Sequence, residues 1–145
     1  MALAIDLDQP DDAVLVDLAR AWAERPGGTL DLLYVAGTHA TTSWIRDEAA
    51  RQLVATELDK LHHLAATRLT DLLDRLPEGM RGVARVLDGS PVPALVAASS
   101  AYDALLIATH GRRGLGHLWL GSVAERVVRG CGVPVLVVPV TRPAS

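Results

Sequence analysis

The chain has 145 residues, of which 50% are hydrophobic and 21% charged, and its formal net charge at pH 7 is −3. This balance is that of a globular domain rather than a disordered chain, and the length suits a single domain, residues 1–145, with one core. The small negative charge gives no reason to expect nucleic acid as a partner. Because the sequence contains no Phe, we expect Ala, Leu and Val to fill the core.

Covalent cross-links and membrane spans are also unexpected. Cys131 is the one cysteine, so an intramolecular disulfide and an all-cysteine zinc site are excluded. The start "MALAIDLDQPDD" lacks the basic region of a signal peptide. No run approaches the roughly 20 apolar residues of a membrane span. We therefore expect a cytoplasmic protein.

The first elements are a strand, a helix and a strand. Ala2–Ile5 is a short apolar run, which predicts a buried strand. Pro10, followed by Asp11 and Asp12, predicts a helix N-terminus in which the two carboxylates favour the helix dipole. Leu30–Val35 is the second apolar run and predicts a strand. The helix between the two strands is indicated by apolar residues at helical spacing, namely Val14, Leu15, Leu18, Ala19 and Trp22.

A long helix and a third strand come next. After a polar loop at residues 38–43, one apolar stripe predicts a helix that continues to Leu76. Gly82–Leu87 predicts the third strand, and Arg85 within it suggests an edge position. The stripe of the long helix is formed by Val54, Leu58, Leu61, Ala65, Leu69, Leu72 and Leu76.

The last third of the sequence continues the alternation. Ser90 as the cap and Pro91 as the first residue predict a helix that ends near residue 100. Ala104–Thr109 predicts a fourth strand, Ser122–Arg129 a helix, and Val133–Val140 a fifth strand, with a frayed tail at 141–145. Strict alternation of strands and helices predicts an α/β fold, a single doubly wound parallel sheet with helices on both faces.

The stretch "HGRRGLGHLWLGS", His110 to Ser122, joins the fourth strand to its helix. Loops at the carboxyl ends of parallel strands are where such folds bind ligands. Glycines let backbone N–H groups approach an anion, and the following helix N-terminus adds partial positive charge. Arg112 and Arg113 supply further charge. The loop has no Walker lysine, so it predicts a phosphate site of another kind, or a tight turn alone.

The motif "THG", nine residues and "GS", followed by a short helix and "VPVLVVP", resembles the universal stress protein family. The stretches "AIDLD", "LLYV", "DGSPVPALVAAS" and "YDALLIATHG" agree with it in order. The resemblance covers nearly the whole chain. It implies a Rossmann-like, adenine nucleotide alpha hydrolase-like sheet of order 3-2-1-4-5. The first and fourth strands would then be neighbours where the winding reverses.

Nucleotide-binding members of that family carry G-2x-G-9x-G-[S/T], and this sequence matches it from its second glycine onward. Ala108 stands at the first glycine, and Asp8 stands where many members have Ser or Thr. The resemblance implies ATP, or AMP or ADP, bound with Mg²⁺ that protein ligands alone do not hold. The implied nucleotide-binding residues are Asp6, Leu7, Val35, Ala108, His110, Gly111, Arg112, Gly114, Gly121, Ser122 and Val123.

Several alternatives stay open at this point. Asp6 either contacts the ligand or caps the following helix, and Arg112 and Arg113 contact phosphate or solvent. His110 either orients the loop or touches the ligand. No nucleophile paired with a base is recognisable, so we expect a stress-response switch or sensor with at most slow ATP hydrolysis. The two departures from the motif favour the alternative of a dimeric interaction module that binds no ATP.

The fifth strand predicts a protein partner. In the implied order it is an edge strand, and an apolar edge invites pairing with another chain. Family members pair this strand across a two-fold axis. We therefore expect a homodimer whose interface contains Val135, Leu136, Val137, Val138 and Val140.

Overall fold

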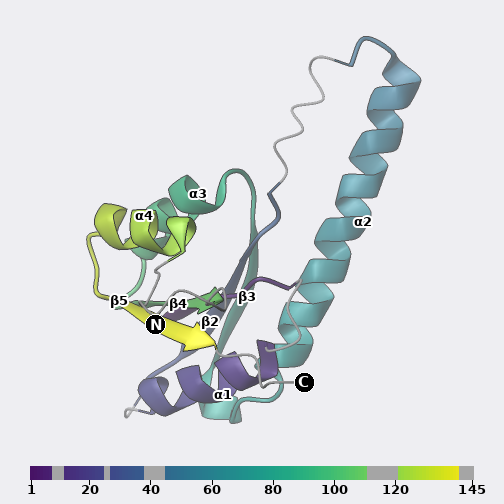
Figure 1. Ribbon diagram of the computed structural model, residues 1–145. Coiled ribbons are helices and arrows are strands. Elements are labelled where there is room, and N and C mark those ends of the chain that lie inside the picture. Colours follow the sequence, from purple (N-terminus) through teal and green to yellow (C-terminus); the bar gives the residue numbers. More distant parts are fainter. Residues whose placement is uncertain (8–11, 25–26, 38–44, 111–120, 141–145) are drawn as a thin grey trace, which may run out of the picture.

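The computed structural model describes residues 1–7, 12–24, 27–37, 45–110 and 121–140 (Figure 1). Five parallel strands form one sheet in the order β3-β2-β1-β4-β5, which confirms the predicted fold class and strand order. In the described ranges no helix has the length and apolar character needed to cross a membrane. The elements are β1 (Ala2–Ala4), α1 (Asp12–Ala23), β2 (Leu30–Val35), α2 (Glu48–Leu73), η2 (Glu78–Met80), β3 (Arg81–Leu87), α3 (Pro91–Ser99), β4 (Leu105–His110), α4 (Ser122–Gly130) and β5 (Val135–Val140).

The core has two layers, one on each face of the sheet. Because successive side chains of a strand point to opposite faces, Leu3 and Leu106 pack with α1 and α2 in the first layer. Ala2 and Leu105 pack in the second layer with buried residues of α3 and α4. Figure 1 shows the two pairs of helices on opposite sides of the sheet. Both faces are therefore covered, as the apolar strands predicted.

The start of α2 lies later in the chain than expected, and the start of α3 lies where it was predicted but lacks the expected capping hydrogen bond. Helix α2 begins at Glu48, where Oδ1 of Asp47 accepts hydrogen bonds from the N–H groups of Ala49 (2.8 Å) and Ala50 (3.3 Å). Ser90 does occupy the N-cap of α3, but its side chain makes no capping hydrogen bond. Pro91 is the first residue of α3, where a missing N–H costs nothing because that N–H has no helical partner.

The predicted apolar stripe of α1 is partly wrong. Leu15 and Ala19 are buried as expected, but Val14, Leu18 and Trp22 are 56%, 44% and 53% exposed. The residues that fill the remaining core positions are Val16 and Ala23. Two apolar stripes overlap on this helix, and only packing against the sheet decides which of them faces the core.

The stripe of α2 is correct only in its C-terminal half. Ala65 and Leu69 are buried, together with Leu73, whereas Leu61 is 58% exposed. A helix of 26 residues is about 39 Å long, while strands of six residues span roughly 20 Å. Figure 1 shows the N-terminal half of α2 extending beyond the sheet, so side chains there have no sheet to pack against.

A polar network joins β2 and β3 to the turn that precedes β4, near the amino ends of the strands. Asp31 of β2 accepts hydrogen bonds from the N–H of Val83 at Oδ1 (2.9 Å) and from the hydroxyl of Tyr102 at Oδ2 (3.0 Å). Arg85 of β3 donates to the same hydroxyl (3.2 Å). Burial raises the pKa of Tyr102, so its hydroxyl remains a donor to Asp31 at neutral pH. This network lies at the irregular step in the register between β2 and β3.

Candidate functional site

A cavity of about 530 Å³ opens at the carboxyl ends of the strands. It lies where β1 and β4 are neighbours, with Ala4 in register with Ile107. Its walls come from the ends of β1, β2 and β4 and from the first residues of α1, α3 and α4. Because helices leave β1 and β4 toward opposite faces, the sheet has a switch point here, the position at which open α/β sheets bind ligands.

The N-terminus of α4 borders this cavity. Ser122, Val123 and Ala124 line it, together with the N-cap residue Gly121. Among the described residues no side chain caps the helix, and its first helical hydrogen bond runs from the N–H of Glu125 to the carbonyl of Gly121 (2.9 Å). The first-turn N–H groups therefore give this wall a partial positive charge that favours an anion.

Two carboxylates line the cavity from the other side. Asp6 follows β1 and is exposed, whereas Asp12 is the first residue of α1 and is only 5% exposed. Arg68 of α2 places Nη2 3.9 Å from Oδ2 of Asp12, which provides an opposite charge for the buried carboxylate. The sequence indicated Asp12 only as a dipole partner of its own helix. Its place in a cavity wall follows from the packing of α1 beside β1.

Much of the remaining wall is apolar. Ile5, Leu33, Val35, Leu95 and Ile107 all line the cavity. A cavity with apolar walls and a few convergent polar groups is typical of small-molecule sites. This one is suited to a ligand with a flat apolar part and an anionic part, since the apolar walls and the helix N-terminus border the same space.

The structure brings together six of the predicted binding residues in this cavity. Leu7, in contrast, is 4% exposed and belongs to the first core layer, and it is not among the lining residues. His110 ends β4, next to the cavity. Gly111, Arg112 and Gly114 lie outside the described residues, as do Asp8 and Arg113. The six that line the cavity are Asp6, Val35, Ala108, Gly121, Ser122 and Val123.

His62 and Cys131 are not among the residues that line the cavity. His62 of α2 has Nε2 3.2 Å from Oδ1 of Asp88, a contact that joins α2 to the end of β3. Cys131 follows α4 and packs against the second core layer, which indicates a structural role. Across the described ranges, no group of three or more His, Cys, Asp or Glu side chains is placed to hold a metal ion.

Residues 1–139 match the Universal stress protein family. The universal stress protein UspA from Lactobacillus plantarum is 17% identical, with a TM-score of 0.70 over 95% of this chain and 97% of that one. A universal stress protein in complex with cAMP is 22% identical, with a TM-score of 0.60 over 95% and 96%.

A third structure, the universal stress protein from Archaeoglobus fulgidus in complex with dAMP, is 18% identical, with a TM-score of 0.53 over 94% of both chains. No curated protein matches the sequence. At these identities the solved structures establish the fold, while the family match extends over residues 1–139 of the 145. The chain therefore belongs to the universal stress protein family.

Proposed function

We propose that this protein binds an adenine nucleotide, ATP with Mg²⁺, in the cavity between β1 and β4, and acts as a nucleotide-dependent switch or sensor in the stress response. The observation that carries the proposal is the shared cavity of two segments far apart in the chain. The N-terminus of α4 and the carboxylate of Asp6 both border it. Two similar universal stress proteins have been solved with cAMP and dAMP, which supports an adenine nucleotide as the ligand class.

Each part of the nucleotide has a matching part of the cavity. The apolar side chains of Val35 and Ile107 suit the faces of the adenine ring, and the first turn of α4 suits the phosphates. Asp6 is positioned to accept hydrogen bonds from the adenosine part. Mg²⁺ would offset the phosphate charge beside Asp6 and Asp12, whose carboxylate oxygens are ligands that this ion prefers.

The proposed role is binding rather than fast catalysis. The lining residues that the structure describes include no histidine or cysteine. The hydroxyl of Ser122 lies at the helix start, where it suits a contact with a phosphate oxygen. Among the described residues no hydrogen bond joins this hydroxyl to Asp6 or Asp12, the carboxylates of the wall, so at most slow hydrolysis is proposed.

Binding of ATP with Mg²⁺ is expected to stabilise the protein. At a free concentration of a hundred times the dissociation constant, a ligand that binds only the folded state adds about 2.7 kcal/mol to the free energy of unfolding. The measurement is thermal unfolding with and without ATP and Mg²⁺. Absence of any shift at millimolar nucleotide would contradict the proposal.

Gly121→Val is the variant that ties the shift to this cavity. A Cβ at Gly121 would have no atom of the described residues within 4 Å, and because Gly121 lines the cavity the added volume enters the space proposed for the phosphates. We expect this variant to lose the nucleotide-dependent shift. Gly132→Val is the matched control, because Gly132 has equal room and lies outside the cavity wall. If Gly121→Val keeps the nucleotide-dependent thermal shift, the N-terminus of α4 is not part of the nucleotide site.

A second candidate function is that of an interaction module that binds no ATP. The observation that favours it is Ala108, which lines the cavity at the position where nucleotide-binding relatives have a glycine. The thermal measurement distinguishes the two functions, since the interaction module shows no nucleotide-dependent shift.

We further propose that the protein is a homodimer through β5. No described strand pairs with the outer side of β5, which is one edge of the sheet. The N–H of Leu105 donates to the carbonyl of Pro134, and Leu105 is in register with Val135. In a parallel ladder, the backbone groups of Val135 and Val137 then point to the open edge. These groups are the ones that a second β5 would pair with.

Val137→Pro is expected to abolish association through β5 and so to lower the mass of the assembly. It removes an N–H from the open edge and leaves the hydrogen bonds to β4 in place. Pro139, two residues further on, already shows that a proline fits this edge. Leu136 is a poorer target for this test, because its N–H points toward β4 and a proline there would break the ladder between the two strands. Sedimentation equilibrium measures the mass, and circular dichroism checks the fold. A folded variant of unchanged mass would contradict pairing through β5.

A further inference from the structure

The N-terminal half of α2 exposes three leucines. Leu53, Leu61 and Leu64 are 65%, 58% and 59% exposed, whereas the buried residues of this helix all lie from Ala65 onward. Exposed apolar side chains that gather on one element mark interaction surfaces. Since this half of the helix extends beyond the sheet, the surface is reachable by another molecule (Figure 1).

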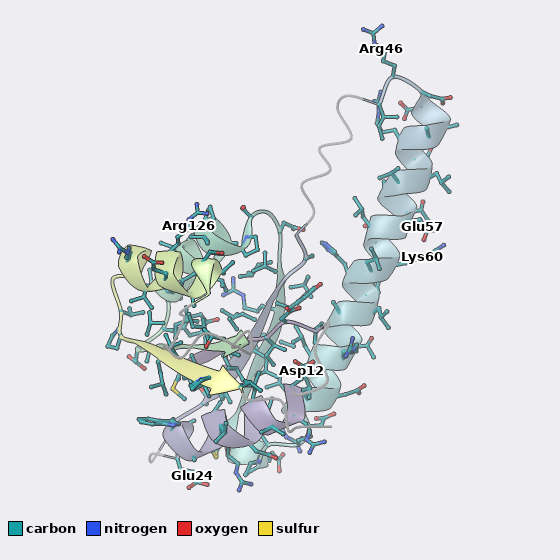
Figure 2. The ribbon with its side chains drawn as sticks, in the orientation of Figure 1. Asp12, Glu24, Arg46, Glu57, Lys60 and Arg126 are labelled. Atoms are coloured by element: carbon teal, nitrogen blue, oxygen red, sulfur yellow. The ribbon has the colours of Figure 1, made fainter. Side chains whose placement is uncertain are left out.

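Four residues of this segment form a ridge at the spacing i, i+4, i+7 and i+11: Leu53, Glu57, Lys60 and Leu64. At about 100° per residue they fall within roughly 60° of one another around the helix. Glu57 and Lys60 form an ion pair of 2.7 Å, and their side chains are 59% and 66% exposed. Figure 2 shows both pointing away from the sheet. We call these four residues the Leu53–Leu64 ridge.

The Leu53–Leu64 ridge is complementary to itself when the helix is turned end for end. About a two-fold axis at the level between Leu58 and Asp59, Leu53 comes opposite Leu64 of a second copy, and Glu57 comes opposite Lys60 of that copy. Each contact occurs twice, as a two-fold axis requires. A parallel arrangement in register would instead place Glu57 against Glu57 and Lys60 against Lys60.

We propose that the Leu53–Leu64 ridge docks antiparallel against the same ridge of a second copy of this chain. The leucines supply apolar contact at both ends, and the four charges at the centre form alternating opposite pairs that select the antiparallel orientation. Arg46, which lies at the tip of this arm in Figure 2, comes level with Asp71 of the second copy, again with opposite charge. Because the ridge extends beyond the sheet, the two sheets lie at opposite ends of the helix pair.

Disulfide trapping tests the arrangement directly. In a Cys131→Ala background, we expect the double variant Leu53→Cys, Leu64→Cys to form a covalent dimer on mild oxidation, seen on non-reducing gels. The two cysteines of one chain are eleven residues apart, about 16 Å along the helix, so they cannot bridge each other. Neither single variant should cross-link, because antiparallel docking holds the two copies of one position about 16 Å apart along the helix.

Gln52→Cys with His63→Cys is the matched control. It has the same eleven-residue separation and two exposed positions on a different face of α2. This control should not cross-link. Failure of the Leu53, Leu64 pair to cross-link, or equal cross-linking of the control or of the single variants, would overturn the proposal. The outcome does not depend on ATP binding or on pairing through β5, so their failures can be told apart.

Charge reversal tests the complementarity without cysteines. In a Val137→Pro background, which isolates this contact from β5, Glu57→Lys should weaken self-association by about tenfold or more, because it places Lys against Lys twice. Adding Lys60→Glu restores opposite pairs and should restore the association constant. Sedimentation equilibrium gives both values. If the double variant associates no better than Glu57→Lys, the partner of this ridge is another protein and the proposal is wrong.

Discussion

Leu69→Ala is expected to lower the free energy of unfolding by roughly 2–5 kcal/mol, the range for a leucine removed from a packed core. The side chain of Leu69 has no exposed surface and lies in the first core layer. The same substitution two turns earlier, Leu61→Ala, should change the free energy of unfolding by less than about 0.5 kcal/mol, because Leu61 is 58% exposed.

Urea unfolding of both variants measures this difference within one helix. The two substitutions remove the same atoms and leave the same residue, so helix propensity cancels in the comparison. Only burial differs between the two positions. Similar losses in both variants would mean that the N-terminal half of α2 packs against the body of the protein after all.

Gly82→Ala is the second large effect that we expect, a loss of roughly 1–3 kcal/mol from overpacking. A Cβ at Gly82 would lie 2.7 Å from the carbonyl oxygen and 2.8 Å from the carbonyl carbon of Leu30, and it would also collide with Oδ1 of Asp31. The Asp31 side chain can move, but the backbone of β2 cannot move without disturbing the sheet. The strand β3 would have to shift away from β2.

Two comparisons separate these causes by chemical denaturation. Gly79→Ala is the control, since a Cβ there has no atom within 4 Å, and the substitution should be neutral or stabilising by up to about 1 kcal/mol. Asp31→Ala added to Gly82→Ala should not restore stability, because the Leu30 backbone remains in contact. Full recovery in that double variant would show that only the carboxylate stood in the way.

The strands could be predicted because their signal is local. Runs such as "LLIAT" are apolar without interruption, which is typical of strands covered on both faces, and β4 lies within one residue of its predicted bounds at each end. The strand order is not local. The apolar runs predicted a doubly wound sheet, while the position of β1 between β2 and β4 came from the resemblance to a family.

Local sequence patterns did not predict which face of each helix is buried. On α1, Leu18 and Val16 both fit a helical stripe, and the sheet selected Val16. In β2, Asp31 interrupts an apolar run, which indicates that its side chain has a specific partner. The sequence does not predict that this partner is Tyr102, because the two residues are 71 positions apart. Such pairs depend on which strands become neighbours.

The candidate site likewise contains residues that the sequence could place and residues that it could not. Gly121 and Ser122 could be placed at a helix N-terminus from the sequence, because a glycine-rich loop precedes an apolar helical pattern. Asp12 could not be placed in the same cavity, since its role beside Arg68 depends on how α1 and α2 pack together. The position of Asp12 in the cavity wall therefore depends on contacts between elements far apart in the sequence.

Helix α2 extends beyond the sheet, so its length sets the distance between its N-terminal tip and the body of the protein. Its last turns anchor it through Leu69 and Leu73, while the turns before Ala65 contribute no buried residue. Helical turns inserted or deleted in the early part would leave both hydrophobic layers in place, and the cavity at the carboxyl ends of the strands as well. Such changes would alter how far from the body the tip is held, so that separation can vary without changing the cavity.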